Sequence, residues 1–444
     1  MFSPKDKSDK PLTATIIAEA DHGILQKHIS KNALKVLNQL NHAGYDAFLV
    51  GGGVRDLMLG LRPKDFDIAT NATPEQVRSL FRNSRIIGRR FRLVHVIFGR
   101  EVLEVATFRS NQTEIQTNQK SSKSRQCPDS GMITRDNIFG TIDEDAVRRD
   151  FTVNALFYNI VDNSVIDFLG GIEDLKNREM KIIGDAKTRY REDPVRMLRA
   201  VRLSIKLGLT LSKETLQPIP ELASLLEPIS NARLWDESLK LFLHGHAQQT
   251  WNKLVETKLA DCLFPQTMDS LKTSPDSFSH FLAQAFSSTD SRIKQNKPVT
   301  PAFLFAVWLW QPLLDKQQRY IESGLSLGES FNKAASSVLR ESHNRIGLPK
   351  RFSIAVREIW HLQNQLPKRF GKRAEKVFSH PRFRAAYDFL LLRAMPDSDD
   401  ELLAQWWTDY QNVNLDQRQK MVQSLTRNRG RNSSKKRYPR KTNS

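Results

Sequence analysis

Hydrophobic and polar positions follow two different periods along the chain, and the change falls near residue 176. Between about Asn32 and Leu169, short runs of β-branched and aromatic residues alternate with helical stretches. The runs predict strands at Tyr45–Val50, Phe66–Thr70, Val94–Gly99, Glu101–Phe108 and Ser164–Gly170. From Asp193 to about Trp407, apolar positions recur at helical spacing and prolines separate the helices. The expected fold class is α+β, a mixed-sheet head followed by an all-helical part.

Changes in composition divide the chain into five expected regions. These are a flexible N-terminus (1–30), the head (31–175), a helical neck (176–265), a helical body (266–425) and a disordered basic tail (426–444). The polar stretch from Ser110 to Gly131 is expected to be a mobile loop within the head. From Arg427 onward the tail has eight basic residues and no acidic one, so nothing there can fill a core.

Charge and cysteine content narrow the class of protein. The 444 residues contain 68 Lys and Arg against 49 Asp and Glu, a net charge of +19, which favours a polyanionic partner such as nucleic acid; a basic membrane-surface protein is the alternative. Only Cys127 and Cys262 are present, which excludes a disulfide framework and a cysteine-rich zinc site. The first ten residues lack the apolar core of a signal peptide, and the apolar run Ala302–Trp310 is too short to span a membrane. A soluble protein of a reducing compartment is expected.

The first candidate site is the segment LVGGGVRDLMLG, from Leu49 to Gly60. A β-like run ends in three glycines and continues into a helix, so backbone amides can approach a phosphate closely. Arg55 falls in the first helical turn and could reach the same anion. The pattern is neither a Walker loop nor a dinucleotide-binding fingerprint. A simple strand-to-helix turn explains the glycines about equally well.

The second candidate is the pair Asp65 and Asp67. Residues two apart on a strand point to the same face, so the carboxylates would lie side by side while Phe66 turns into the core. Two close carboxylates need a cation, and their hard oxygen ligands suit Mg²⁺. A solvated strand edge is the alternative. A glycine-rich loop about a dozen residues upstream favours a shared phosphate and magnesium site.

Two further clusters contain arginines beside carboxylates. In the first, Arg148 and Arg149 precede Asp150, which could complete a metal site; Glu104 is a rival third carboxylate, and purely structural pairing is the alternative. The second is REDPVRMLRAVR, in which Asp193 caps a helix that starts at Pro194. Its Arg196, Arg199 and Arg202 then form one stripe, and Glu192, if helical, would join Arg196. Such a face can present donors and acceptors to a base edge.

In order and spacing, LVGGGVRD, KDFD, RRDFTVNAL and REDPVRMLRAVR resemble the nucleotidyltransferase family that includes bacterial poly(A) polymerases and CCA-adding enzymes. The segment Ile86–Val96, the triple glycine, RPKDFD, FRAAYDFLLLRA and the basic tail are similar to the poly(A) polymerase branch. The resemblance implies a polymerase β-like nucleotidyltransferase head, with helical neck, body and tail. It implies template-independent addition of AMP from ATP to RNA 3′ ends, which promotes RNA decay.

The same resemblance implies roles for individual residues. Asp65 and Asp67 would bind two Mg²⁺ ions, with Asp150 as the third catalytic carboxylate. The nucleotide-binding residues would be Gly52, Gly53, Arg55 and Arg149 at the triphosphate or ribose, and Glu192, Asp193, Arg196 and Arg199 at the base. The implied partners are ATP, the 3′ ends of messenger, small and precursor transfer RNAs, and RNA-decay proteins, for a cytoplasmic monomer. A CCA-adding enzyme is the main alternative; a non-catalytic RNA-binding protein and a transferase acting on other molecules are weaker ones.

Overall fold

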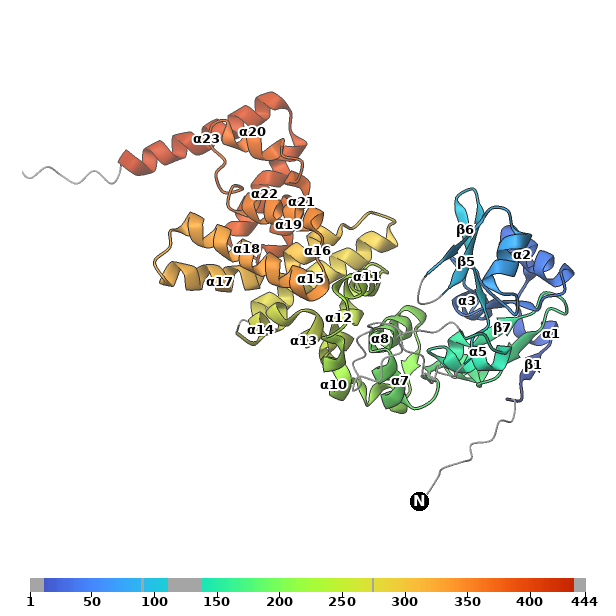
Figure 1. Cartoon of the computed structure of the whole chain (residues 1–444). Coiled ribbons are helices and arrows are strands. Elements are labelled where there is room, and N and C mark those ends of the chain that lie inside the picture. The colour runs from blue at the N-terminus through green and yellow to red at the C-terminus, as the bar shows by residue number, and fades with distance from the viewer. Residues whose placement is uncertain (1–11, 89–91, 111–137, 274, 435–444) are drawn as a thin grey trace, which may run out of the picture. The chain divides into compact units, whose positions relative to one another are not determined.

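The computed structural model describes residues 12–88, 92–110, 138–273 and 275–434 (Figure 1). The chain forms two compact units, Met1–Glu227 and Pro228–Ser444. The first unit contains the mixed sheet, and the second is helical throughout the part that the structure describes. This agrees with the fold class expected from the sequence. The loop expected over 110–131 lies almost wholly outside the described residues. The region boundaries expected at 175, 265 and 425 stay predictions.

An eight-stranded sheet forms the centre of the first unit, in the order β1-β8-β7-β2-β3-β6-β5-β4. Its strands are β1 (Thr15–Ile17), β2 (Ala47–Val50), β3 (Asp67–Thr70), β4 (Ser84–Ile87), β5 (Leu93–Phe98), β6 (Glu101–Thr107), β7 (Leu156–Tyr158) and β8 (Val165–Asp167). Only the β3–β6 pair is parallel among these described strands. That pairing places the start of β3 beside the middle of β6.

Helices cover the sheet and bury its apolar positions. α2 (Lys31–His42) packs against β2 and β3, and α4 (Pro74–Leu80) packs against β4 and β5 (Figure 1). One core cluster joins Val50, Ala69 and Phe157 from three neighbouring strands to Ala146 of α5 (Ile142–Arg148). α3 (Gly52–Met58) follows β2 directly, so the sheet determines where this helix begins.

Short elements complete the first unit. They are α1 (Glu19–His22), η1 (Gln26–His28), η2 (Thr152–Asn154), α6 (Gly171–Lys176), β9 (Glu179–Met180), α7 (Ala186–Glu192), α8 (Val195–Leu207), β10 (Thr210–Leu211), α9 (Lys213–Leu216), α10 (Ile219–Leu222) and η3 (Ala223–Leu226). β9 and β10 pair in parallel as a separate two-stranded sheet. α8 buries Met197, Leu198 and Val201 on one face, as the helical spacing of apolar residues predicted.

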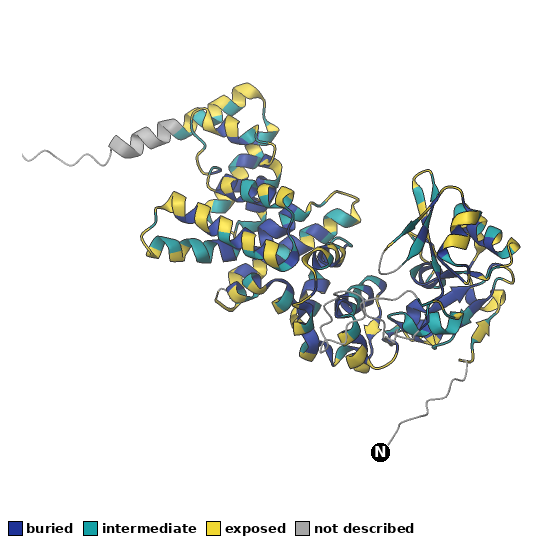
Figure 2. Ribbon diagram, in the orientation of Figure 1, coloured by how far each residue is buried: buried dark blue, intermediate teal, exposed yellow. Residues whose placement is uncertain are grey.

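Most helices of the second unit bury one face and expose the other (Figure 2), whereas α16 has no exposed residue. They are α11 (Asn231–Phe242), α12 (Ala247–Glu256), α13 (Leu259–Leu263), α14 (Pro265–Thr273), α15 (Pro275–Lys294), α16 (Pro301–Trp308), α17 (Trp310–Glu322), α18 (Leu327–Ile346), α19 (Lys350–Gln363), α20 (Arg373–Phe378), α21 (Phe383–Arg393), α22 (Asp399–Asn412) and α23 (Leu415–Ser434). The Trp308 ring lies 4.7 Å from Phe242 and 4.5 Å from Phe264, at the centre of an aromatic core.

The five strands predicted from sequence are all present, and their ends differ from the predicted ones by at most three residues. The strands that the pattern missed are only two to four residues long, too short to show a period of two. β1 is one of them. It pairs with β8 through Thr15 and Asp167, so residues 15–28, expected to be flexible, carry regular structure because of a partner far away in the chain.

The tail expected to be disordered from residue 426 overlaps a helix in the structure. α23 continues to Ser434, and residues 435–444 lie outside the described part. The helix starts at a reciprocal cap, in which the Asn414 side chain accepts from the Gln417 N–H and the Gln417 side chain accepts from the Asn414 N–H. A capped helix can extend into a charged sequence whose composition alone suggests disorder.

No helix among the described residues has the length and apolar content that crossing a membrane requires.

Candidate active site

Asp65 and Asp67 lie where the sheet meets the glycine-rich loop. β3 begins at Asp67, both aspartates are exposed, and Phe66 between them is 8% exposed. The expected alternation is therefore confirmed. Gly53 lies against this segment, since a Cβ there would be in ordinary contact with the backbone oxygen of Asp65 at 3.4 Å and with the Phe66 ring at 3.7 Å. The glycine-rich loop therefore packs against the backbone that carries the two aspartates.

Gly51 makes the turn from β2 into α3. Its φ of 68° and ψ of −132° suit glycine alone, since a side chain would be strained there. A Cβ on Gly51 would also lie 3.1 Å from Nη1 of Arg149. At Gly52 a Cβ would come within 3.4 Å of the Arg55 guanidinium. Gly51 and Gly52 therefore lie beside arginine side chains.

Glu104 is the third carboxylate at this place in the sheet. The parallel pairing of β3 and β6 sets Asp67 opposite Glu104, and the antiparallel pairing of β6 and β5 sets Glu104 opposite His95. Nε2 of His95 lies 3.4 Å from Oε1 of Glu104. Directly opposed residues share a face of the sheet, so Asp67, Glu104 and His95 form a row. Sequence analysis named Glu104 only as a rival to Asp150.

The pKa of Asp67 indicates that negative charge is crowded in this row. Partial desolvation, followed by the carboxylates of Glu104 and Asp65, raises the pKa of Asp67 to about 6, while Arg149 opposes the shift. Within the described ranges, no three His, Cys, Asp or Glu side chains form a ready-made metal cluster. Two aspartates whose negative charges oppose each other, with hard oxygen donors, nevertheless fit Mg²⁺ completed by substrate phosphate oxygens.

This shift predicts a pH-dependent effect of magnesium on stability. The pKa of Asp67 is higher in the folded than in the unfolded chain, so the folded state binds more protons between about pH 4 and 6, and the metal-free protein loses stability as pH rises through that window. We expect Mg²⁺ to raise the melting temperature clearly at about pH 7.5 and little at about pH 5. Thermal unfolding with Mg²⁺ or EDTA measures this. An equal Mg²⁺ effect at both pH values, or one that survives Asp67→Asn, would contradict it.

Asp150 occupies a different environment. Burial by itself would raise the pKa of Asp150, but Arg199, together with hydrogen bonds from Asn154, Arg199 and the Phe151 N–H, lowers it to about 2. Nε and Nη2 of Arg199 donate to Oδ2 at 2.8 and 2.5 Å, and Nδ2 of Asn154 donates to Oδ1 at 3.0 Å. Both carboxylate oxygens of Asp150 therefore already accept hydrogen bonds within the protein. Glu104, in contrast, is the carboxylate that lies beside Asp67. That Asp150 is catalytic stays a prediction.

Arg55 points into the protein. Its side chain is buried, donating to Oδ1 of Asp56 at 2.9 Å through Nε and to Oδ1 of Asn154 at 2.5 Å through Nη1. Since Asn154 also donates to Asp150, a chain of hydrogen bonds runs from α3 to Arg199 on α8. The geometry gives Arg55 a positioning role, and contact with phosphate stays a prediction.

The predicted base-selecting face lies at the junction of α7 and α8. α8 begins at Val195, one residue later than predicted, and the Asp193 carboxylate accepts from the Val195 N–H at 3.2 Å. Glu192 ends α7, yet its Oε2 still meets Nη1 of Arg196 at 2.8 Å. Glu192 and Arg196 are therefore joined, although they belong to two helices and not one.

Arginines gather around Glu192 and the end of α5. Burial, followed by the positive charges of Arg109, Arg189 and Arg196, lowers the pKa of Arg148 to about 10. Arg149 pairs with Asp145 at 2.9 Å and lies near enough to Asp67 to lower its pKa. Guanidinium groups that repel one another in this way are well suited to bind a polyphosphate. We call Arg109, Arg148, Arg149, Arg189 and Arg196 the arginine cluster.

The sequence motifs indicate only part of this cluster. Arg148, Arg149 and Arg196 lie within motifs, whereas Arg109 and Arg189 have no role predicted from the sequence. Nη1 of Arg189 meets Oε2 of Glu192 at 2.8 Å, and Nη2 donates to the Arg148 oxygen, also at 2.8 Å. The signal for Arg189 was its place three residues before Glu192 on α7. Arg109 follows β6 and lies outside the motifs, so no local pattern indicates its place in the cluster.

Comparison with known families covers most of the chain. Residues 47–181 match the Poly A polymerase head domain, 208–271 match the Probable RNA and SrmB- binding site of polymerase A, and 323–442 match the Polymerase A arginine-rich C-terminus. The chain is 51% identical over 401 residues to Poly(A) polymerase I of Salmonella typhimurium, covering 89% of this chain and 86% of that protein. The chain belongs to the poly(A) polymerase I family. It is a poly(A) polymerase, a nucleotidyltransferase.

CCA-adding enzymes are more distant relatives. That of Lactobacillus helveticus is 36% identical over 229 residues, which cover 52% of this chain and 54% of that enzyme. The crystal structure of the Bacillus stearothermophilus CCA-adding enzyme in complex with CTP has a TM-score of 0.59 and 25% identity, over 88% of this chain and 82% of that one. The fold is therefore shared with CCA-adding enzymes, while poly(A) polymerase I resembles the chain over nearly its whole length. The preference for the poly(A) polymerase branch is confirmed.

Proposed function

We propose that this poly(A) polymerase joins AMP from ATP to RNA 3′ ends at the carboxylate row of Asp65, Asp67 and Glu104, with two Mg²⁺ ions. The observation that carries the proposal is the strand register that sets Asp67 beside Glu104, two residues from the exposed Asp65. The raised pKa of Asp67, which Arg149 of the arginine cluster opposes, agrees with this crowding of carboxylates. Bound there, Mg²⁺ supplies Lewis-acid chemistry that makes the RNA 3′-hydroxyl more acidic and offsets charge on the departing pyrophosphate. The reaction needs no protein nucleophile.

The residues of this chain would bind and orient the nucleotide. Asp65 and Asp67 would hold the ions, with Glu104 increasing the negative charge beside them. The arginine cluster and the backbone at Gly52 and Gly53 would hold the triphosphate, since guanidinium groups and free amides bind phosphate oxygens well. Asp150 would act mainly as a positioning residue, because its carboxylate fixes Arg199 on α8.

The base would meet the face formed by Glu192, Asp193, Arg196 and Arg199. The carboxylate of Glu192 is held between Arg189 and Arg196, each 2.8 Å away, so its orientation is fixed before a base arrives. A fixed set of donors and acceptors is what selection of one base requires. We propose that this face accepts adenine, and that the substrates are messenger, small and precursor transfer RNAs of the cytoplasm, extended by a monomer and then passed to RNA-decay proteins.

The function is tested by an extension assay. Purified protein and Mg²⁺ are incubated with ATP or CTP and either a generic oligo-RNA or a tRNA that lacks its CCA end. Long ladders with ATP alone on the generic RNA are expected. Two additions from CTP on the tRNA, followed by a single addition from ATP, would overturn the proposal in favour of CCA addition.

The basic end of the chain should contribute affinity for RNA without sequence preference, because phosphates are alike in every sequence. Deleting the residues after Arg427 removes seven of the eight basic residues of this end. We expect weaker RNA binding and a shallower dependence of affinity on salt, with AMP addition to saturating RNA retained. Filter binding at several salt concentrations measures both quantities. An unchanged salt slope would show that this end serves another purpose.

A further inference from the structure

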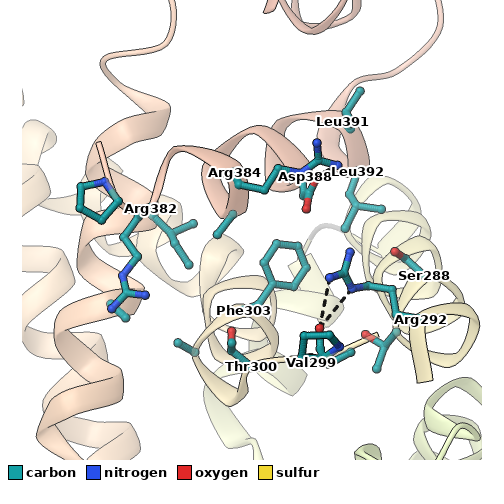
Figure 3. A pocket seen from close by; sticks show the side chains of 17 residues that line it. Ser288, Arg292, Val299, Thr300, Phe303, Arg382, Arg384, Asp388, Leu391 and Leu392 are labelled. Atoms are coloured by element: carbon teal, nitrogen blue, oxygen red, sulfur yellow. Dashed lines mark hydrogen bonds and ion pairs between the residues drawn. The ribbon is translucent and has the colours of Figure 1, made fainter. Parts of the chain in front are cut away.

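The second unit contains a cavity of about 440 Å³ that the reaction described above does not use. α15, the segment 295–300, α16, α19 and α21 form its walls, all within Pro228–Ser444 (Figure 3). The volume lies within the range of pockets that bind small molecules or single nucleotides. The carboxylate row belongs to the other unit, so this cavity is a separate site.

An aromatic ring and a fixed guanidinium face this cavity. Phe303 of α16 is half-buried, and its ring stands in the open space (Figure 3), in edge-to-face contact with Phe389 at 6.3 Å. Arg292 of α15 donates to the Pro298 oxygen through Nε at 3.4 Å and Nη2 at 3.1 Å, which fixes its guanidinium at the wall. Among the described residues, Arg292 takes part in no ion pair.

α21 and the residue before it, Arg382, supply the opposite wall, with one carboxylate and two further arginines. Nη2 of Arg384 meets Oδ1 of Asp388 at 2.9 Å, but the Arg384 side chain is 69% exposed. Arg382 pairs with Glu358 of α19 at 3.1 Å, and both of these side chains are also exposed. Exposed pairs of this kind are weak, so a ligand can displace them. The cavity therefore offers cations at its rim and one acceptor, Asp388, inside.

We propose that this cavity binds one nucleotide of the single-stranded RNA substrate. The base would stack on Phe303, and its phosphate would pair with Arg292, the cation that has no competing carboxylate. Aromatic stacking combined with arginine contacts is how proteins bind single-stranded nucleic acid without strict sequence preference. An acidic peptide fits less well, because Asp388 would repel its carboxylates and Phe303 would have no base to stack against. The inference rests on the proposed function, since it takes RNA as the substrate.

Asp388 adds a preference among bases. A carboxylate accepts a hydrogen bond from the exocyclic amino group of adenine, cytosine or guanine, whereas uracil offers only its ring N3–H. The cavity should therefore hold adenine better than uracil, and a growing tail of adenines would supply suitable occupants.

The test measures RNA binding by the full chain, in EDTA and without ATP, so that catalysis is absent. Labelled oligo(A) and oligo(U) are titrated with the wild type and with Arg292→Gln, Phe303→Leu and Asp388→Asn. Arg319→Gln is the control for Arg292→Gln, because it also removes one positive charge but at an exposed position of α17 outside the cavity. Phe303→Tyr keeps the ring and controls for disturbed packing. Thermal unfolding checks that every variant is folded.

We expect Phe303→Leu to weaken oligo(A) binding by about five-fold or more, and Phe303→Tyr to bind as the wild type does. Arg292→Gln should weaken binding and reduce the salt slope by about 0.7, the value for one phosphate contact on a single strand. Arg319→Gln should change neither quantity. Asp388→Asn should bring the affinities for oligo(A) and oligo(U) closer together, since an amide can serve both bases.

Equal effects of Arg292→Gln and Arg319→Gln would overturn the inference, because charge alone would then explain them. Unchanged RNA binding by a folded Phe303→Leu variant would also overturn it. The same holds if Arg292→Gln loses affinity for a poly(Glu) peptide but keeps its affinity for RNA. If the wild type extends RNA with ATP alone and the cavity variants bind RNA normally, the cavity is not an RNA-binding site, but the proposed function still holds. A wild type that fails to extend RNA would refute the proposed function directly.

Discussion

Asp65→Asn and Asp67→Asn should each lower AMP addition by about a thousand-fold or more while leaving the fold and RNA affinity intact. Both side chains are exposed, so neither variant disturbs packing, and each removes one negative charge from the row that includes Glu104. Because partial desolvation and then the neighbouring carboxylates raise the pKa of Asp67, Asp67→Asn also removes an unfavourable charge from the metal-free protein. That variant should melt no lower than the wild type at neutral pH in EDTA.

Single-turnover extension with ATP measures the chemical step, and filter binding measures RNA affinity. Asp236→Asn, at an exposed position of α11 in the second unit, is the matched control and should extend RNA normally. Glu104→Gln should also slow extension if the third carboxylate of the row is Glu104. Extension near the wild-type rate by either aspartate variant would refute the assignment of this site.

Replacing Arg199 by Met should destabilise the first unit by about 2–3 kcal/mol and also slow extension. Asp150 has an 11% exposed side chain and would lose its cationic partner, and loss of a fully buried partner costs about 3–5 kcal/mol. The lower figure applies because the Arg199 side chain is 35% exposed and solvent screens part of the interaction. Extension should fall because α8, which carries Arg196, would no longer be tied to the head.

The placement of the tryptophans allows this loss to be assigned to one unit. All seven lie between Trp235 and Trp407, in the second unit, so their fluorescence follows only that unit during urea unfolding. Circular dichroism follows both units. Arg199→Met should shift a transition seen by circular dichroism to lower urea and leave the fluorescence transition in place. A shift in fluorescence alone would contradict the prediction.

The dependence of stability on pH gives a second test of the ion pair between Asp150 and Arg199. The pKa of Asp150 is about 2 in the folded protein, below its ordinary value of 3.8, so the pair stabilises the fold fully above about pH 4 and less as pH falls toward 2. The difference between wild type and Arg199→Met should shrink over that range. The double variant Asp150→Asn with Arg199→Met should recover part of the lost stability, because no buried charge is then left unpaired.

Several features of this protein follow from local sequence alone. The alternation of Asp65, Phe66 and Asp67 needs only the two-residue period of an extended chain, and the turn at Gly51 needs only the conformations open to glycine. The start of α8 was predicted within one residue because a proline and a capping carboxylate act over a single turn. The family motifs have the same local character, and they identified the poly(A) polymerase branch.

Tertiary structure decided which distant residues meet. Glu104 lies beside Asp67 because of the register of a parallel pair of strands, and Asp150 faces Arg199, 49 residues further along the chain. Arg109 and Arg189 join the arginine cluster in the same way, from elements that carry no shared motif. The physical reason is range: hydrogen-bonded turns and side-chain periods act over a few residues, whereas strand register and helix packing depend on the whole buried core. Local motifs therefore predict the chemistry of the site, and the folded core places Glu104 beside Asp67 and Arg199 beside Asp150.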